Sequence, residues 1–292
     1  MQSLNSSFNG GKTRVSDLPG RSELAEVFKL VEQHSAPARA ASGPRYNCPM
    51  CGRFVSPGEQ DLERIFHVRG TGEAFPARYN VAPTMPVPMI YVDRHDGSRR
   101  LALARWGLVP FWAKGPKPPS HSFNARLEDA AVNAMWREPF RNARCIIPAL
   151  GWYEWKEQEA LDQASGEVRK YKQPYFMHLP DNSLIGFAGL MAWTKTEESD
   201  AWTSSCSILT TSAHGPAAGV HHRMPVALAE PAYDAWLDRA LVDPEKVGAL
   251  IKENPLDVEI EKRPVSTRVN GSRVDDPSLL EPIDGNSVLP HK

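Results

Sequence analysis

The chain has 292 residues, a net charge of −1 and 24% charged residues, which is the composition of an ordinary globular protein. No apolar run reaches the about 18 residues of a membrane span, and the first 30 residues lack the apolar core of a secretory signal. The four cysteines do not suggest a disulfide framework in a chain of this length, so we expect a cytoplasmic protein.

Residues 1–49 are rich in Ser, Gly, Asn and Ala and show no strand pattern. An amphipathic helix is possible at 22–34, and the rest of this segment reads as flexible. From residue 50 onward the pattern changes to strands with a few helices. We expect strands at 87–93, 101–110, 144–155, 174–179, 184–193 and 205–212, and helices near 126–137, 230–238 and 243–252. This pattern predicts one β-rich α+β domain.

The first helix of this domain has a sequence signal of its own. In the stretch 56–59, Ser56 is a candidate N-cap, Pro57 suits the first helical position, and Glu59 could close a capping box. A helical stripe of apolar residues follows, ending at Phe66. We therefore expect a helix that begins directly after Ser56.

Cys48 and Cys51 have the spacing of half a zinc site or of a redox dithiol. A structural zinc site needs two more ligands, and Cys145 and Cys206 belong to separate apolar strands. A thioredoxin-like dithiol needs a helix that starts at its first Cys, whereas the residues after Cys51 read as a strand and a turn. We therefore expect no metal and no cofactor, and Cys51 remains a candidate nucleophile.

The stretch from Arg94 to Arg126 is strongly basic, with one acid, Asp96, and interleaved aromatic rings. Cations for phosphates and ring faces for bases are what a single-stranded nucleic acid groove needs. The alternative is a solvated basic face beside aromatic residues of the core. The basic and aromatic residues are Arg94, Arg99, Arg100, Arg105, Trp106, Phe111, Trp112, Lys114, Lys117, Phe123 and Arg126.

Three further polar residues are candidates for chemistry. Glu154 lies in a nearly continuous apolar run, where loss of water would raise its pKa toward neutrality, unless it faces outward from a half-buried strand. His221 precedes an apolar strand and could donate a proton, although a lone His is more often structural, and Arg223 could bind a phosphate. Asn124 lies where a loop enters a predicted helix, so an N-cap is its alternative role.

Seven ordered blocks resemble the SRAP family, the SOS response-associated peptidases, which are understood as abasic-site processing proteins. The resemblance runs from residue 50 to about residue 285, and the order of the blocks makes chance an inadequate explanation. The blocks are MCGRF (50–54), RYNVAPT (78–84), RWGLVPFWAK (105–114), FNARLE (123–128), RCIIPALGWYEW (144–155), HHRMPVAL (221–228) and VSTRVN (265–270).

The resemblance implies a single β-rich, barrel-like domain with peripheral helices and a basic groove. In the family an N-terminal Cys forms a covalent thiazolidine with the aldehyde of an abasic site in single-stranded DNA, a lyase-like chemistry. Cys51 matches that Cys, and the resemblance implies catalytic roles for Asn124, Glu154 and His221. It also implies DNA contacts by Arg53, Asn80, Trp106, Arg126 and Arg223, with Trp106 lying against a base.

The position of Cys51 departs from the family pattern, because 49 residues precede Met50. The start codon could be misassigned, the extension could be cut before Cys51, or the extended form could be real and unable to form a thiazolidine. We favour the first, because residues 1–49 have no strand pattern. The expected organisation is an extension at 1–49, an SRAP domain at 50–285 and a tail at 286–292.

Two other functions compete with the abasic-site reading. Cys51, His221 and Asn124 could form a thiol peptidase, a hydrolase that would act as a protease on its own extension. The chain could also bind single-stranded DNA without catalysis. We expect single-stranded DNA as the partner, no membrane, a monomer, and a nucleoid-associated location within the cytoplasm.

Overall fold

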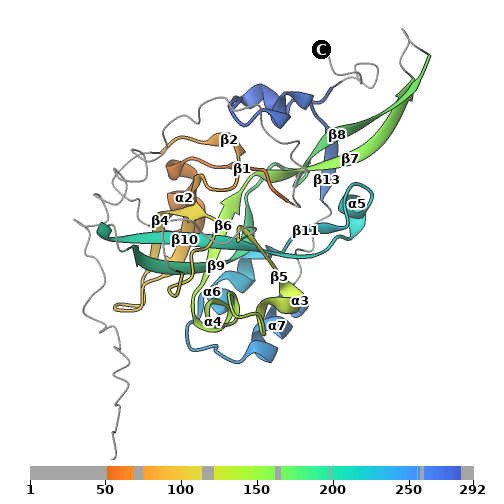
Figure 1. Ribbon diagram of the computed structural model, residues 1–292. Coiled ribbons are helices and arrows are strands. Elements are labelled where there is room, and N and C mark those ends of the chain that lie inside the picture. Colours follow the sequence, from red (N-terminus) through yellow and green to blue (C-terminus); the bar gives the residue numbers. More distant parts are fainter. Residues whose placement is uncertain are drawn as a thin grey trace, which may run out of the picture.

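The computed structural model describes residues 51–68, 75–113, 122–161, 166–196, 199–254, 256 and 260–283. The extension at 1–49, with its possible helix at 22–34, and the tail at 286–292 lie outside these residues. The described chain forms two β-sheets with short helices around them (Figure 1).

Sheet A has five strands and carries the start of the described chain. Its strand order is β13 (Glu261–Pro264), β8 (Val168–His178), β7 (Gly151–Leu161), β1 (Phe54–Ser56) and β2 (Arg78–Val81). Every pairing in this sheet is antiparallel. The outer halves of β7 and β8 extend from the body as a two-stranded ribbon (Figure 1).

Sheet B has eight strands and provides the larger wall of the domain. Its order is β11 (Arg223–Pro225), β10 (Ser199–Ser212), β4 (Arg99–Trp106), β3 (Pro86–Val92), β6 (Arg144–Ala149), β9 (Ile185–Thr196) and β12 (Ala227–Leu228), and the short β5 (Asn124–Arg126) also pairs with β10. Strands β9 and β10 also pair with each other, so the strands β10, β4, β3, β6 and β9 form a closed circle. This arrangement gives the fold its barrel-like character.

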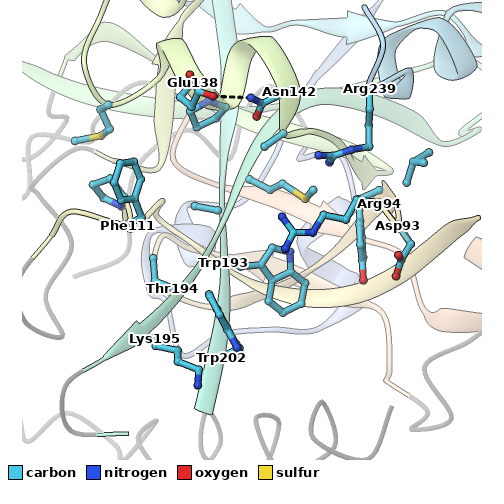
Figure 2. Close-up of a pocket in the computed structure, with 18 of the residues that line it drawn as sticks. Asp93, Arg94, Phe111, Glu138, Asn142, Trp193, Thr194, Lys195, Trp202 and Arg239 are labelled. Carbon is cyan, nitrogen blue, oxygen red and sulfur yellow. Dashed lines mark hydrogen bonds between the residues drawn. The ribbon is translucent and has the colours of Figure 1, made fainter. Parts of the chain in front are cut away.

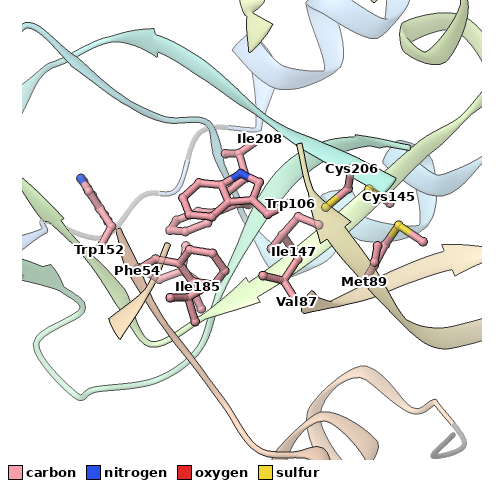
Figure 3. Packing of buried hydrophobic residues seen from close by; sticks show 14 of the residues in the cluster. Phe54, Val87, Met89, Trp106, Cys145, Ile147, Trp152, Ile185, Cys206 and Ile208 are labelled. Carbon is pink, nitrogen blue, oxygen red and sulfur yellow. The ribbon is translucent and has the colours of Figure 1, made fainter. Parts of the chain in front are cut away.

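The main apolar core lies between the two sheets. Phe54 and Trp152 from sheet A meet Trp106, Phe187 and Ile208 from sheet B, and all five are at most 2% exposed (Figure 3). The rings of Phe54 and Trp106 pack edge to face with centroids 5.0 Å apart. Burying both inner faces in one core fixes how the two sheets sit on each other.

Helices cover the outer face of sheet B, where a second cluster is buried. These helices are α2 (Glu59–Phe66), α3 (Leu127–Ala130), α4 (Arg137–Asn142), η2 (Glu230–Ala232), α6 (Tyr233–Leu237) and α7 (Pro244–Glu253), while α5 (Gly215–Ala218) precedes β11. The 3₁₀ turns η3 (Thr267–Asn270) and η4 (Pro277–Leu280) pack on the outer face of sheet A, where they bury Val269 and Leu279. The α+β class expected from the sequence is confirmed.

Several sequence predictions of local structure are wrong in detail. The capping box does not form, because Ser56 belongs to β1 and α2 begins at Glu59 after an uncapped Gly58. The expected strand 144–155 is two strands, since the chain turns at Gly151. A Cβ there would lie 2.2 Å from the Met177 carbonyl oxygen, which only glycine avoids.

The helix expected near 126–137 is also interrupted. Strand β5 occupies residues 124–126, and turns separate α3 from α4. In that gap the Asn133 side chain accepts a hydrogen bond from the Met135 N–H at 2.9 Å, a local bond that competes with helix formation. The helices expected near 230–238 and 243–252 are confirmed as η2 with α6 and as α7.

Candidate active site

The candidate site forms where sheet A meets the C-terminal end of β10. Strands β5 and β11 both pair with β10 around Thr210, so Asn124 and Arg223 come from its two sides. Cys51 precedes β1 in sheet A, and Glu154 lies on β7 beside it. Residues spread over 172 positions of the sequence therefore meet in one place.

The backbone pairing of β1 and β7 places Cys51 next to Glu154. The Tyr153 N–H donates to the Arg53 carbonyl at 3.0 Å, so the antiparallel pairing continues toward the start of the described chain. The backbone nitrogen of Cys51 then donates to Glu154 Oε1 at 2.9 Å. A carboxylate is thus held against the nitrogen that would be a free amine in a chain starting at Cys51.

Glu154 faces inward, which decides against the outward-facing alternative. It shares its side of β7 with Trp152, a core residue, and is 3% exposed. Burial raises the pKa of Glu154 to about 7, opposed by the hydrogen bond from Cys51. A carboxyl group that changes charge near neutral pH can both take and give a proton.

The backbone of Arg223 holds both His221 and the Cys51 thiol. Its N–H lies 3.1 Å from His221 Nδ1 as a donor and its carbonyl oxygen lies 3.3 Å from the same nitrogen, so the Arg223 backbone can hold either tautomer of the ring. Its carbonyl oxygen lies 3.7 Å from Cys51 Sγ as a hydrogen-bond acceptor. Partial burial lowers the pKa of His221, which favours the neutral ring.

Glu154 also faces the imidazole. Its second oxygen, Oε2, lies 4.0 Å from His221 Nδ1, while Oε1 accepts from Cys51. One buried carboxylate therefore lies between the reactive nitrogen and the histidine ring. The 4.0 Å separation exceeds a hydrogen bond, so the contact between Glu154 and His221 is electrostatic.

Asn124 lies in β5 and is not a helix cap, because the N-cap of α3 is Arg126. Its Nδ2 donates to the Cys51 carbonyl oxygen at 3.4 Å. The alternative N-cap role is therefore wrong, and the side chain contributes to holding Cys51. The four residues expected to be catalytic thus lie around one point.

Glu128 is a site residue that the sequence analysis did not single out. Its two carboxylate oxygens accept hydrogen bonds from Arg223 NH1 at 2.7 Å and NH2 at 2.9 Å, which lowers the pKa of Glu128. Arg223 NH2 also donates to the Thr210 carbonyl at 2.6 Å. Glu128 is the last residue of the block FNARLE. It is far from Arg223 in the sequence, so no local pattern predicts that the two side chains pair.

We expect Glu128→Gln to strengthen DNA binding. Without the carboxylate, the Arg223 guanidinium becomes available to a phosphate, so affinity for single-stranded DNA should rise several-fold. The plot of log K against log salt should steepen by about 0.7, the value for one added phosphate contact on a single strand. Fluorescence anisotropy over a salt series measures both effects, with Glu253→Gln on α7 as the control. An unchanged slope would show that Arg223 keeps a purely structural role.

Arg53 and Asn80 are bound to the protein itself. Arg53 NH1 donates to Asn80 Oδ1 at 2.7 Å and to the Val269 carbonyl at 2.8 Å. Asn80 is fully buried, and its Nδ2 donates to three carbonyl oxygens between Val269 and Val274. The two side chains anchor the segment that follows β13, so we leave Asn80 out of the proposed DNA surface. Arg53 would have to exchange carbonyl contacts for a phosphate.

Trp106 has no exposed face for a base. It is 0% exposed in the main core, and its Nε1 donates to the Phe123 carbonyl at 2.9 Å (Figure 3). The expectation that it lies against a base does not fit this burial, because stacking would require the core to open. The exposed rings of the basic segment are Phe111, 79% exposed, and Trp112, 50% exposed.

We expect Trp106→Ala to destabilise the protein by about 3–5 kcal/mol, the cost of removing a large buried aromatic side chain. The matched change Trp112→Ala, at an exposed site, should alter the free energy of unfolding by less than about 0.5 kcal/mol. Urea titration followed by circular dichroism measures both. A stable Trp106→Ala variant that had lost DNA affinity would restore the base-stacking role.

The basic segment divides into paired and unpaired cations. Arg99 pairs with Asp234 at 2.5 Å, and Arg100 pairs with Asp93 at 3.0 Å. Lys114 and Lys117 lie outside the described residues. Arg126 is exposed on β5, two positions after Asn124 and therefore on the same side of the strand. Of the expected phosphate-binding residues, Arg126 is the one whose side chain has no hydrogen bond or ion pair within the described residues.

The part of the chain that the structure describes contains no group of three or more His, Cys, Asp and Glu side chains that could hold a metal ion, and Cys48 lies outside it. None of its helices is long and apolar enough to cross a membrane.

The chain is similar to proteins from several organisms. The abasic site processing protein YoqW of Bacillus subtilis is 36% identical over 238 residues, which cover 80% of this chain and 99% of YoqW. The abasic site processing protein HMCES of Gallus gallus is 30% identical over 237 residues, covering 70% of this chain and 66% of HMCES.

Solved structures show the same fold. A protein from Bacteroides thetaiotaomicron matches with a TM-score of 0.65 and 19% identity, covering 80% of this chain and 99% of that protein. A phage-related protein from Bordetella bronchiseptica matches with a TM-score of 0.54 and 27% identity, over 74% of this chain and 95% of that one. The model of the family described as SOS response associated peptidase (SRAP) matches residues 50–272, which include every residue of the site, and this chain therefore belongs to the SRAP family.

Proposed function

We propose that this protein binds single-stranded DNA and captures abasic sites through a covalent thiazolidine at Cys51. The observation that carries the proposal is the hydrogen bond from the Cys51 nitrogen to the buried Glu154 carboxylate. The names of the relatives, abasic site processing proteins, support the same general function. The proposed place of action is wherever the cell exposes single-stranded DNA.

The covalent step needs a free amine and a thiol on the same residue. The amine of an N-terminal Cys51 attacks the aldehyde carbon of a ring-opened abasic site, and loss of one water gives an imine. The thiol sulfur then adds to the imine carbon, and its proton passes to the nitrogen, which closes a five-membered ring. The adduct therefore equals protein plus DNA less one water, and no oxidant or cofactor is consumed.

The surrounding residues suit the proton transfers of this sequence. Glu154, whose pKa is raised by burial, can take a proton from the attacking amine and return one to the departing hydroxyl. His221, in its protonated form, would donate a proton to the sugar ring oxygen as the sugar opens. Asn124 and the Arg223 carbonyl hold the Cys51 backbone and thiol. Arg126 would meet a phosphate beside the lesion.

The backbone of Cys51 supports a chain start at this residue. Its φ is +47°, in the left-handed region that costs a non-glycine residue about 1–2 kcal/mol. In a chain that starts at Cys51, no preceding peptide group has to be accommodated in this conformation. The family match also starts at residue 50. A misassigned start and removal of the extension would both produce this form.

A thiol peptidase remains the alternative activity. In such a site an Asn commonly orients the His, whereas here the Arg223 backbone binds His221 Nδ1 and Asn124 donates to the Cys51 carbonyl. The contacts therefore suit an amine-based reaction better. Self-cleavage before Cys51 is compatible with both abasic-site capture and thiol peptidase activity.

Intact mass spectrometry tests the proposal directly. The gene is expressed untagged with its native upstream DNA, and the product is incubated with a single-stranded oligonucleotide that carries one abasic site. Under denaturing conditions we expect a protein mass that starts at Cys51, and an adduct heavier by the oligonucleotide less one water. A protein that starts at Cys51 and gives no adduct would overturn the covalent chemistry.

A further inference from the structure

A large open cavity lies away from the candidate site. Its volume is about 970 Å³, and it is lined by the ends of β3, β9 and β10, by α4 and by the loop after β4. Strand β10 connects the two regions. Trp202, on the cavity wall, is six residues from Ile208, which pairs with Asn124, and a strand rises about 3.3 Å per residue. The cavity therefore lies roughly 20 Å from Asn124 along β10.

The cavity carries more positive than negative charge. Four cationic residues line it, Arg94, Arg100, Lys195 and Arg239, against two acids. Of the acids, Asp93 pairs with Arg100 at 3.0 Å, and Glu138 accepts a hydrogen bond from Asn142 at 2.6 Å. An anionic ligand would complement this excess of positive charge.

Arg94 and Arg239 are the cations best placed for such a ligand. Figure 2 shows both guanidinium groups pointing toward the middle of the cavity. Within the described residues, neither makes a hydrogen bond or an ion pair. Burial and the nearby charge of Arg94 lower the pKa of Arg239, while Asp93 opposes this shift. An anion bound between two neighbouring guanidinium groups would offset the repulsion between their positive charges.

Aromatic rings line the same cavity. Trp193 lies next to Arg94 and is half-buried, and Phe111 stands on the opposite side in Figure 2. Phe111 and Trp112 are the two most exposed rings of the basic segment. Rings beside guanidinium groups match a nucleic acid strand, which has a stacking face and a charge at every nucleotide.

The loop that carries these rings leads to the candidate site. The Leu108 N–H donates to the Ser122 carbonyl at 3.0 Å, so these two residues lie next to each other. Ser122 is two residues before Asn124, so the wall of the cavity and the site belong to one connection. A distance of about 20 Å equals roughly six nucleotides at the ~3.4 Å spacing of one B-form strand, and fewer in a stretched strand. Single-strand grooves commonly cover about 4–16 nucleotides.

We propose that this cavity binds bases and phosphates of the same DNA strand, several nucleotides from the abasic site, through Arg94, Arg239 and Phe111. The inference rests on the proposed function, because it assigns a path to the strand held at Cys51. It adds a second contact region that does not take part in the covalent chemistry. Its role is to raise the residence time of the protein on single-stranded DNA before a lesion is met.

The test compares charge removal in the cavity with equal charge removal elsewhere. The variants are Arg94→Gln/Arg239→Gln and the control Arg64→Gln/Lys252→Gln, whose changes lie on α2 and α7 outside the cavity. The probe is fluorescent oligothymidylate of about 20 nucleotides without an abasic site, longer than the usual groove. Anisotropy over a salt series gives the dissociation constant and its salt dependence.

For the cavity variant we expect at least tenfold weaker binding and a salt slope shallower by about 1.4, the loss of two phosphate contacts. Phe111→Ala should weaken binding several-fold without changing the slope, because it removes stacking and no charge. A cavity variant that matches the control in both quantities overturns the inference.

The proposed function is tested separately in the same preparation. Wild-type protein that starts at Cys51 is incubated with an oligonucleotide of about three nucleotides with the abasic site in the middle, which spans only ~10 Å at B-form spacing. If this short probe is captured and the cavity variant binds DNA as well as the control does, the proposed role of the cavity is rejected and the proposed function stands. Absence of capture with both this probe and an oligonucleotide of about 20 nucleotides that carries one abasic site would reject the proposed function, while the anisotropy result still decides the cavity.

Discussion

A protein that begins with Gly followed by Cys51 is expected to lose stable capture of abasic sites by about a thousand-fold or more, relative to a protein that begins at Cys51. In the extended protein the Cys51 nitrogen is an amide and cannot attack an aldehyde. The added glycine amine can still form an imine, but no thiol stands at the position that closes a five-membered ring. Ring closure within one residue is the step with the high effective molarity that is lost.

The measurement is the fraction of oligonucleotide that stays attached after heating in denaturant, followed over time. Cys51→Ser is the matched variant, because it keeps the amine and replaces the thiol by a poorer nucleophile. It should trap DNA only after chemical reduction of the imine. A thiol peptidase would tolerate the added glycine. Equal peptide cleavage by both proteins, without DNA capture by either, would therefore favour that alternative.

The same comparison bears on residues 1–49. A chain that keeps these residues has an amide at Cys51, so it should behave as the glycine-extended protein does. If it gains activity on storage, and its mass falls to that of a chain starting at Cys51, the extension is removed by cleavage. If only the shorter form is ever made, the start lies at Met50.

Much of the fold follows from patterns in the sequence. The apolar runs from 87–93 to 205–212 are strands, because they are buried on one or both faces of the two sheets. The site residues could be named in advance only because short blocks around Cys51, Asn124, Glu154 and His221 resemble a family. No spacing along the chain shows that β1, β5, β7 and β11 bring them together at β10.

The exceptions have physical reasons. Trp106 sits among cations in the sequence, yet its side of β4 faces the core, so its neighbours in sequence do not share its environment. Asn80 reads as a surface residue, but it satisfies three carbonyl oxygens of a segment about 190 residues later. Contacts of this range depend on the assembled sheets, and a local pattern cannot predict them.

The ribbon formed by the outer halves of β7 and β8 was also missed by the sequence analysis. Its residues are charged and lack the alternation of a half-buried strand, because neither face packs on the core. Cross-strand pairs such as Lys170 with Glu157 line it instead, at 3.4 Å. Register there is set by continuation of the pairing near Gly151 and His178.

Glu154→Gln is expected to slow covalent capture by about 10²–10⁴-fold, the usual contribution of a general acid or base. The amide can still accept the hydrogen bond from Cys51, so the geometry is kept while proton transfer is removed. Affinity for single-stranded DNA should stay unchanged, which separates this effect from lost binding. The pH dependence of capture should also lose one inflection. In the form that starts at Cys51 that inflection falls below 7, since the terminal ammonium group lowers the pKa of the neighbouring carboxyl group.

The free energy of unfolding provides an independent check on Glu154. The protein to use is one in which Cys51 is preceded by another residue, so that its nitrogen is an amide. The folded state raises the pKa of Glu154 from 4.5 to about 7, so folding favours the protonated form. Its contribution to stability is present below about pH 4.5 and is lost as pH rises to about 7, an effect of about 3 kcal/mol at 1.36 kcal/mol per pKa unit. Glu154→Gln should therefore be more stable than wild type at pH 8 by up to that amount, and equal to it at pH 4.

Urea unfolding at the two pH values measures this difference. A Glu154→Gln variant that is less stable at pH 8 would mean that the charged carboxylate is stabilised in the fold, which would contradict the raised pKa. If Glu154→Gln captures DNA slowly and is also more stable at pH 8, the Glu154 carboxylate lowers the stability of the fold and contributes to the reaction. That combination distinguishes a catalytic carboxylate from one that only holds the Cys51 backbone, because a purely structural Glu154 would lose stability and activity together.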